Sequence, residues 1–533
     1  MANITFFLCF SFFGFLFSIS IAYLLKLNSN TTVSMANNGI LFVSNAAKAH
    51  KLCSKVSKFV KDVLYIKFNG GPDSTRSVIS KEIVDIYNKC GNLDVRLMLK
   101  PINSVNKINT SKTIQLVMYD KELTQDISYL KQSLENVVSE CPMQCIDNES
   151  PISVVTSEDV KTYEYVALGG TFDRLHNGHK ILLSQAALRS TNHVTVGVTD
   201  VNMIQSKILW ELIEPVEQRI NNVLQFLRDI NADLEYNVLP IQDMYGPTKD
   251  DPRFQLLIVS EETSRATKKI NDKRKENGLQ LLDFHTIDLA ENLNQQSIEE
   301  ERKISSSNQR MRLLGTLLRE PKPNPHIPDW PYVIGLAGGI ASGKSNITEK
   351  LKLKGAGIVN CDIIAHELYK PGLPLNRTIA EEFGHGVITE GGEVDRKKLG
   401  TIVFGDKNQL KKLNQIVWPA VIEEAQRQVK AFGEQGYRVV VMEAAVMVRA
   451  KWYTSCHELW TVIIPPKEAI KRLQERNNLT EEEARQRIEA QPTNQEQVAL
   501  ANIVFSPFWS YEYTQRQIDR AWDQLQRYLD TRK

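Results

Sequence analysis

Two histidines with three-residue spacing, His176 and His179, follow a glycine turn in this sequence. The turn comes directly after a strand expected at 163–169 and includes Gly170 and Thr171, and an apolar-periodic helix begins just beyond it. Free amides and the dipole at a helix N-terminus attract anions. Side chains three residues apart on a helical turn face the same way, so both imidazoles can hydrogen-bond one phosphate. The pattern predicts a site that neutralises charge on a phosphate under attack.

A second anion-binding motif lies near the end of the same expected domain. Serines 305–307 begin a helix there, and Arg310 follows. Hydroxyls, free amides and a guanidinium could together hold the β- and γ-phosphates of ATP. The residues expected to bind ATP in this domain are Gly170, Thr171, His179, Ser305, Ser306, Ser307 and Arg310.

A complete phosphate loop of the Walker A type follows a third apolar strand. Its glycines let the backbone wrap the phosphates, Lys344 reaches the β- and γ-phosphates, and Ser345 coordinates Mg²⁺. The loop consists of Gly338, Gly339, Ile340, Ala341, Ser342, Gly343, Lys344 and Ser345.

Residues downstream of the loop favour a kinase over a GTPase, because no guanine-reading motif is present. Asp362 follows a strand and could accept a proton from a substrate hydroxyl. Lys344 and Asp362, with the two histidines of the first motif, are the predicted catalytic residues. Arg476 lies in a charged helix-turn-helix at 469–491, although such a helix is often only a solvated face.

Alternating strands and helices position these motifs and predict α/β domains with parallel sheets. A proline-rich stretch separates the first motif-bearing region from the second and indicates a linker. The expected organisation is a membrane anchor at 1–27, an N-terminal α/β domain at 28–156, a transferase domain at 157–318, a linker at 319–331 and a kinase domain at 332–533.

The N-terminal domain carries no recognisable catalytic motif. Strands are expected at 63–68 and 113–119, and a helical stretch at 121–138. A further helix is expected around 311–318, before the linker. Because it carries no catalytic motif, the N-terminal domain at 28–156 is interpreted as structural or regulatory.

Composition is that of a globular multidomain enzyme of 533 residues. A net charge of +2 gives no reason to invoke nucleic acid. Seven cysteines without the dense spacing of a disulfide framework favour a reducing compartment. Cys141 and Cys145 are interpreted as ordinary thiols, because no second Cys or His pair lies at zinc-like spacing.

The first segment has a different character. Residues 4–25 contain no charge, and about 20 apolar residues suffice to cross a bilayer. A cleaved signal peptide is the alternative, but basic residues ahead of the apolar run are lacking. Several lysines follow the run, so the positive-inside rule predicts a cytosol-facing enzyme anchored in a membrane.

The first site resembles the HxGH nucleotidyltransferase superfamily. This superfamily includes class I aminoacyl-tRNA synthetases, but Ser305–Arg310 is similar to the ISSSxxR motif of small-molecule transferases, and no tRNA-binding extension is present. Further similarity at 244–247 and 260–265 points to phosphopantetheine adenylyltransferase of the eukaryotic type. This resemblance implies ATP and 4′-phosphopantetheine as substrates, with Thr171 and Lys207 at the phosphopantetheine and Mg²⁺ neutralising charge.

The second site resembles dephospho-CoA kinase across 359–366, 399–406, 413–420 and 469–491. The resemblance implies that Arg476 belongs to a lid that closes over ATP. His366, Trp418 and Ser506 depart from the bacterial pattern, which puts the CoA-recognition residues in doubt.

The order of the two domains resembles eukaryotic bifunctional coenzyme A synthase, in which the product of one site is the substrate of the next. That resemblance implies the mitochondrial outer membrane as the location, with the cytoplasm as a second possibility. The alternatives are another HxGH transferase fused to a small-molecule P-loop kinase and a nucleotide-binding scaffold. Protein partners are not predicted.

Overall fold

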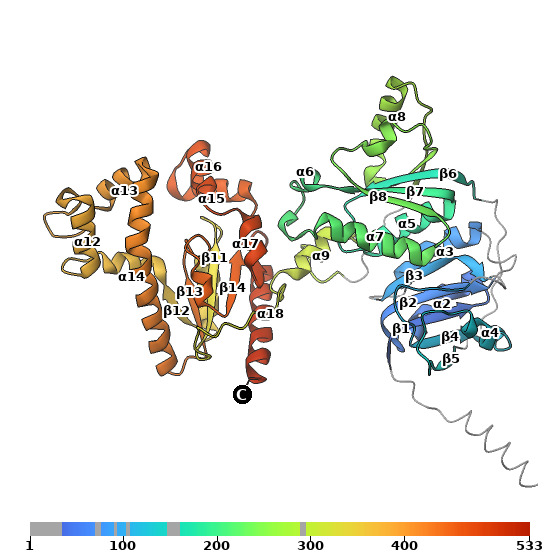
Figure 1. Ribbon diagram of the computed structural model, residues 1–533, viewed down its shortest axis with the longest axis horizontal. Helices are drawn as coiled ribbons and strands as arrows, with labels where there is room; N and C mark the ends of the chain where they lie inside the picture. The colour runs from blue at the N-terminus through green and yellow to red at the C-terminus, as the bar shows by residue number, and fades with distance from the viewer. Residues whose placement is uncertain are drawn as a thin grey trace, which may run out of the picture. The chain divides into compact units, whose positions relative to one another are not determined.

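A computed structural model describes residues 35–69, 76–89, 93–102, 107–146, 160–287 and 295–532. Within these ranges the chain forms three five-stranded sheets in which every pair of neighbouring strands is parallel (Figure 1). The predicted α/β class with parallel sheets is therefore confirmed.

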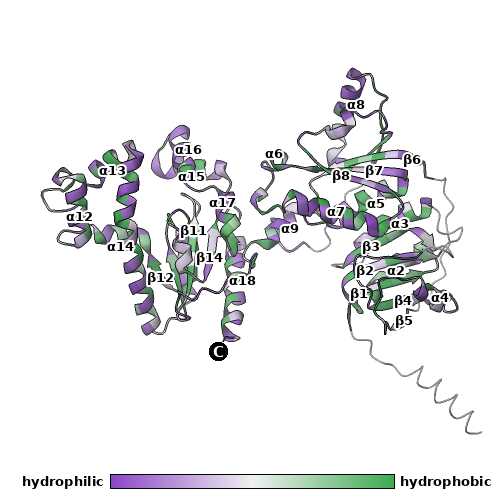
Figure 2. Ribbon diagram, in the orientation of Figure 1, coloured by the Kyte–Doolittle hydropathy of each residue, from purple (hydrophilic) through white to green (hydrophobic). Residues whose placement is uncertain are grey.

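The N-terminal sheet has the strand order β3-β2-β1-β4-β5. Hydrophobic residues gather on its central strands (Figure 2), as expected for parallel strands covered on both faces. Its elements are β1 Ala36–Val43, α2 Ala46–Val56, β2 Val60–Asn69, α3 Arg76–Lys89, β3 Asp94–Ile102, β4 Leu116–Asp120, η2 Lys121–Leu123, α4 Ile127–Gln132 and β5 Met143–Ile146.

The second sheet has the order β10-β9-β6-β7-β8, so strands are added on one side of β6 first and then on its other side, beginning with β9. Ligands of open α/β sheets bind at the carboxyl ends of the strands beside such a switch. Its elements are β6 Tyr163–Gly170, α5 Asn177–Arg189, β7 Ser190–Thr199, α7 Val216–Ile230, β8 Glu235–Ile241, η4 Gly246–Lys249, β9 Leu256–Ser260, η5 Glu261–Thr263, α8 Arg265–Glu276 and β10 Asp283–Ile287.

The third sheet has the order β12-β13-β11-β14-β15, and all seven residues of β11 are buried. Its strands and those helices that carry or support the site are β11 Tyr332–Gly338, α10 Lys344–Leu353, β12 Gly357–Asn360, α11 Cys361–Leu368, α14 Lys407–Glu434, β13 Val439–Glu443, β14 Glu458–Val462, α15 Pro466–Asn477, α16 Glu481–Glu489, α17 Asn494–Leu500, β15 Ile503–Phe505 and α18 Tyr511–Asp530. The remaining helices are α12 Pro374–Phe383, η6 His385–Val387, α13 Arg396–Gly405 and η7 Trp452–Ser455.

Internal contacts divide the chain into two units. One comprises 1–200 and 216–290, and the other comprises 201–215 and 291–533. The second unit therefore includes α6 Val201–Ile204, η3 Trp210–Leu212 and α9 Ser306–Leu313 together with the third sheet. This grouping differs from the predicted domain boundaries, which stay a prediction.

Side chains from these added segments share a hydrophobic core with the third sheet. Leu212 and Leu314 pack in one cluster with Ile463 and Val504. The backbone of the segment also pairs with β15, because Leu317 forms an antiparallel bridge to Ile503. Burial of apolar surface and backbone pairing both stabilise this attachment.

Three expectations from the sequence are wrong in detail. The stretch 121–138 forms only η2 and α4, and 133–138 is not helical. The helix expected at 311–318 is α9 and ends at Leu313, before Gly315 with its positive φ of 73°. Cys53 is disulfide-bonded, although the cysteine spacing did not predict a disulfide framework. Cys141 and Cys145, which were predicted to be ordinary thiols, are free.

The apolar run at 4–25 lies outside the described residues. Among the helices that the structure does describe, none combines the length and apolar character needed to cross a bilayer.

Candidate active sites

His176 and His179 lie against each other at the start of α5. His176 is the N-cap residue, with extended backbone, and His179 is in the first turn of the helix. Their ring centroids are 3.8 Å apart and the rings are nearly parallel. The structure therefore places the two imidazoles side by side, and both side chains are half-buried.

Two neighbours hold this histidine pair in place. The ring of Phe172 lies 5.2 Å from that of His179 and is fully buried. A Cβ added to Gly178 would approach His176 Cε1 to 3.2 Å, which is closer than most real contacts. Gly178 therefore leaves the space that the His176 ring occupies.

The turn between β6 and α5 has an unusual backbone. Phe172 and Arg174 have φ values of 51° and 48°, which are rare for residues other than glycine. Strain of this kind persists where surrounding contacts enforce it. Here buried Asp173 accepts a hydrogen bond of 2.9 Å from Arg174 Nη1.

Arg219 on α7 joins the carboxyl ends of two strands and was missed by sequence analysis. Its Nη1 atom donates to the carbonyls of Thr171 and Thr199 at 2.8 and 3.0 Å. The side chain is 1% exposed. A single arginine in an amphipathic helix gives no sequence signal of such a role, because solvated arginines are far more common there.

Ser305 and Arg310 are placed by α9, in the unit that contains the third sheet. Ser305 is the N-cap, and its hydroxyl accepts from the Asn308 amide at 3.2 Å. Arg310 is 1% exposed, and its Nε donates to the Ile208 carbonyl at 2.8 Å. The Arg310 guanidinium therefore joins α9 to the segment that carries exposed Lys207.

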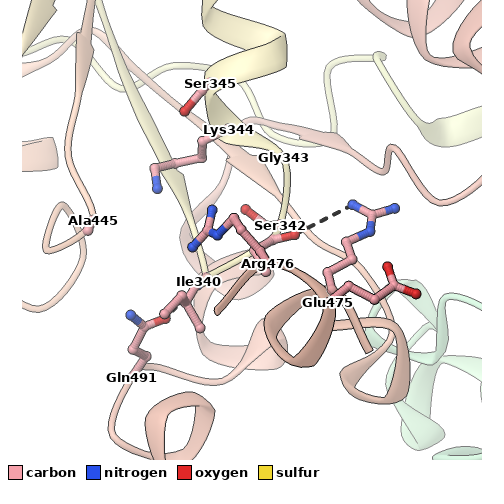
Figure 3. A pocket seen from close by; sticks show the side chains of 12 residues that line it. Ile340, Ser342, Gly343, Lys344, Ser345, Ala445, Glu475, Arg476 and Gln491 are labelled. Carbon is pink, nitrogen blue, oxygen red and sulfur yellow. Dashed lines mark hydrogen bonds between the residues drawn. The ribbon is translucent and has the colours of Figure 1, made fainter. Parts of the chain in front are cut away.

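The phosphate loop lines a pocket of about 630 Å³. Figure 3 shows Lys344 and Arg476 extending into it, while Glu475 points away. The lining residues are Gly339, Ile340, Ala341, Ser342, Gly343, Lys344, Ser345, Ala445, Arg472, Glu475, Arg476 and Gln491. All the predicted loop residues except Gly338 thus share one pocket with the predicted lid arginine.

The backbone of this loop curls as phosphate binding requires. Gly343 has a φ of 92° and caps α10, and Ala341 has a φ of 59°. Gly338 lies at the end of β11, where an added Cβ would come within 2.8 Å of the Val462 carbonyl. Lys344 Nζ donates to the Gly338 carbonyl at 3.4 Å, which places the ammonium beside the loop.

Asp362 lies in the first turn of α11 and is exposed. It does not line the pocket itself. Its Oδ2 atom accepts a hydrogen bond of 3.3 Å from the amide of Ala445, which does line the pocket. Next to it, burial raises the pKa of the Cys361 thiol to about 12, with the nearby carboxylates of Asp362 and Glu443 adding to the shift.

Glu443 at the carboxyl end of β13 was also missed. Its side chain is 5% exposed, and Oε2 accepts from Thr348 at 3.0 Å and from Asn360 at 3.4 Å. The sequence signal for it was a carboxylate directly after a buried valine run. The hydroxyl of Ser345 and the carboxylate of Glu443 are oxygen donors of the kind that Mg²⁺ prefers, so these residues fit this ion.

A central parallel strand, a phosphate loop with a basic pocket and a carboxylate at a neighbouring strand end define a P-loop phosphotransferase domain. The comparisons with known proteins agree. Residues 332–507 match the family model for dephospho-CoA kinase, and residues 167–314 match the cytidylyltransferase-like model.

Curated relatives extend the kinase match. The dephospho-CoA kinase of Carboxydothermus hydrogenoformans is 39% identical over 186 residues, which cover 35% of this chain and 90% of the relative. That of Shouchella clausii is 37% identical, with 35% and 94% covered. A solved dephospho-CoA kinase from Campylobacter jejuni is 22% identical, covers 36% of this chain and 96% of that chain, and has a TM-score of 0.30. Because these curated relatives are well over 30% identical and almost fully covered, the chain belongs to the dephospho-CoA kinase family through its C-terminal domain.

The two-domain prediction is thereby confirmed: one chain carries a cytidylyltransferase-like domain followed by a dephospho-CoA kinase domain. The roles assigned to individual residues stay predictions.

Proposed function

We propose that this chain catalyses two consecutive steps of coenzyme A synthesis. The first step transfers AMP from ATP to 4′-phosphopantetheine and gives dephospho-CoA and pyrophosphate. The second transfers the γ-phosphoryl group of ATP to the 3′-hydroxyl of dephospho-CoA and gives CoA and ADP. The match to nearly whole dephospho-CoA kinases and the phosphate-loop pocket support the second step, and the match of residues 167–314 to the cytidylyltransferase-like family supports the first.

The first step needs no general base, because the attacking phosphate is already ionised. A phosphate oxygen of 4′-phosphopantetheine bonds to the α-phosphorus of ATP, and the bond to the leaving pyrophosphate breaks. The stacked His176 and His179 would donate hydrogen bonds to the charged α-phosphate. Ser305, Ser306, Ser307 and Arg310 are proposed to hold the pyrophosphate, and Thr171 and Lys207 the phosphopantetheine.

The second step does require a proton acceptor. The 3′-hydroxyl attacks the γ-phosphorus, ADP leaves, and Asp362 accepts the hydroxyl proton. The Ala445 amide donates to Asp362 Oδ2 and so orients the carboxylate. Lys344 and Arg476 place positive charge in the pocket where negative charge accumulates (Figure 3).

Mg²⁺ belongs to the same proposal. Ser345, with Glu443 at the carboxyl end of β13, would hold the ion, which would neutralise phosphate charge when bound. The residues of this chain do the rest: they orient the nucleotide, exclude water and accept the proton.

The kinase step is tested with dephospho-CoA and magnesium-ATP. Wild-type protein should form CoA, and Asp362→Asn should reduce the rate by about a hundredfold or more, as loss of a catalytic proton acceptor does. Glu367→Gln is the matched control, because Glu367 lies on the same helix and pairs only with Lys370 among the described residues. Normal CoA formation by Asp362→Asn would contradict the assignment of the base.

We also propose that residues 4–25 anchor the enzyme to a membrane facing the cytosol, with the mitochondrial outer membrane as the site that the family resemblance implies. The uncharged run supports this location. Deletion of residues 1–27 should release the enzyme from membranes after cell fractionation. Membrane association that persists after the deletion would refute the anchor.

A further inference from the structure

The helix-turn-helix of α15 and α16, which the family resemblance identifies as a lid, is joined to the phosphate loop at two points. α15 ends at Asn477, and Asn478 adopts the left-handed conformation that reverses the chain into α16. α16 ends at Glu489. Arg476 lies near the turn between the helices, and its Nε donates only to neighbouring Asn477 among the described contacts.

The carboxyl end of the lid is joined to the loop by Gln491. Its Oε1 atom accepts a hydrogen bond of 2.7 Å from the amide of Ile340, in the middle of the phosphate loop. The backbone N–H of Gln491 donates to the Ile488 carbonyl at 3.1 Å, so the backbone here continues the last turn of α16. Figure 3 shows Gln491 beside Ile340 at the edge of the pocket.

The amino-terminal half of the lid is joined to the next residue of the loop by Arg472. Its Nη1 donates to the Ala341 carbonyl at 3.5 Å, and its Nη2 donates to the Pro507 carbonyl at 2.9 Å. Glu468 accepts from Arg472 Nε at 2.8 Å and fixes the side chain. The lid is thus attached on either side of the Ile340–Ala341 peptide.

The residues after Gln491 are anchored in the core of the kinase. Thr493 and Glu496 form a reciprocal cap at the start of α17. Asn494 donates to the Ile464 carbonyl at 2.9 Å, and Val498 packs in the core beneath. Both ends of the lid are therefore fixed, which restricts where the turn that carries Arg476 can lie.

We propose that Gln491 is a positioning residue of the kinase reaction: its bond to the Ile340 amide holds the lid helices against the phosphate loop, which keeps Arg476 over the transferring phosphoryl group. The proposal rests on the proposed kinase function. Gln491 acts through the loop and the lid and exchanges no proton with substrate.

The chemistry of the pocket predicts what loss of this bond does. A lid held less firmly places Arg476 less accurately and admits water to the γ-phosphate. Transfer to dephospho-CoA should therefore become slower, and hydrolysis of ATP without an acceptor should become relatively faster. A purely structural role would lower the amount of folded enzyme without changing the ratio of transfer to hydrolysis.

The test compares three variants of the full chain. Gln491→Ala removes the acceptor, Gln491→Glu keeps an acceptor but adds a negative charge, and Gln486→Ala is the control. Gln486 is exposed on α16, shortly before Gln491, and its side chain bonds only to Glu482 among the described residues. Each protein is assayed for CoA formation, for ATP hydrolysis without dephospho-CoA and for thermal unfolding.

Gln491→Ala should lower kcat for CoA formation about threefold to tenfold, as expected for one neutral hydrogen bond, and lower the transfer-to-hydrolysis ratio by a similar factor. Gln491→Glu should keep a ratio near that of the wild type and raise KM for ATP, because its carboxylate repels the triphosphate. Gln486→Ala should match the wild type.

If Gln491→Ala shows the wild-type kcat and the wild-type ratio of transfer to hydrolysis, the positioning role is wrong. If the wild type itself makes no CoA, the proposed function fails instead.

Discussion

At the scale of single residues, the two sites depend on side chains that are held by neighbours without catalytic chemistry of their own. Gly178 makes room for the His176 ring, Arg219 joins the carboxyl ends of β6 and β7, and the Ala445 amide orients Asp362. Positioning of this kind governs rates because reacting groups must be aligned within fractions of an ångström.

Replacement of Gly178 with alanine tests this dependence. The added Cβ would crowd His176 Cε1 at 3.2 Å and Nδ1 at 3.3 Å, so the ring should move away from His179. We expect formation of dephospho-CoA to fall about tenfold or more, with kinase activity on supplied dephospho-CoA unchanged. Gly386→Ala is the control, because nothing lies within 4 Å of a Cβ at that position. Equal adenylyltransferase rates in both variants would argue against the placement of His176.

At the scale of elements, the sequence motifs correctly predicted the glycine turn and the helix after each active-site strand. Strand, glycine turn and helix occur at β6 and α5 and again at β11 and α10, as expected from the apolar runs and the glycine spacing. Both motifs are local in sequence, so their geometry is set by neighbouring residues. The helix-turn-helix at 469–491 was likewise predicted correctly as α15 and α16.

Contacts between distant segments could not be predicted in this way. Glu443, Arg219 and Gln491 act through partners far away in the chain, and no local pattern indicates which partners the fold supplies. The same reason explains the error at 121–138. The helix there ends at Gln132, and the backbone then forms isolated bridges from Leu134 and Val137 to the loop at 108–114. Tertiary packing there overrides local helix propensity.

One glycine allows the segment after α9 to pack closely against the kinase unit. Gly315 has a φ of 73°, its amide donates to the Val504 carbonyl at 2.9 Å, and an added Cβ would lie 2.1 Å from the Gln517 carbonyl oxygen. Gly315→Ala should therefore destabilise the kinase unit by about 2–4 kcal/mol, measured as the free energy of unfolding.

Gly278→Ala is the control, because it measures the cost of a side chain at a positive φ without a clash. Gly278 has a similar φ of 70° but nothing within 4 Å of an added Cβ. Its substitution should cost only about 1 kcal/mol. Equal losses for the two variants would contradict the close packing around Gly315.

At the scale of the whole molecule, the domain boundary predicted at 319–331 does not coincide with the grouping of contacts. Tyr513 on α18 donates to the Met311 carbonyl at 2.8 Å, and Arg319 donates to the Val498 and Ala501 carbonyls at 2.8 Å. These bonds and the shared core join the segment after residue 295 to the kinase sheet.

A fragment of residues 332–533 should therefore be less stable than one of residues 295–533. The shorter fragment exposes the core residues that Met311 and Leu314 cover. We expect the difference in thermal midpoint to be several degrees, equivalent to loss of a few kcal/mol. Identical midpoints would show that the kinase domain is independent of α9.

The central claim is that one chain performs both steps in succession, and a single assay tests it most directly. Purified protein receives 4′-phosphopantetheine and magnesium-ATP, and dephospho-CoA and CoA are followed together over time. The wild type should form both products in that order. His179→Ala should form neither product, yet convert supplied dephospho-CoA, and Lys344→Ala should accumulate dephospho-CoA. Wild-type protein that leaves 4′-phosphopantetheine unchanged while phosphorylating dephospho-CoA would contradict the account of the first site.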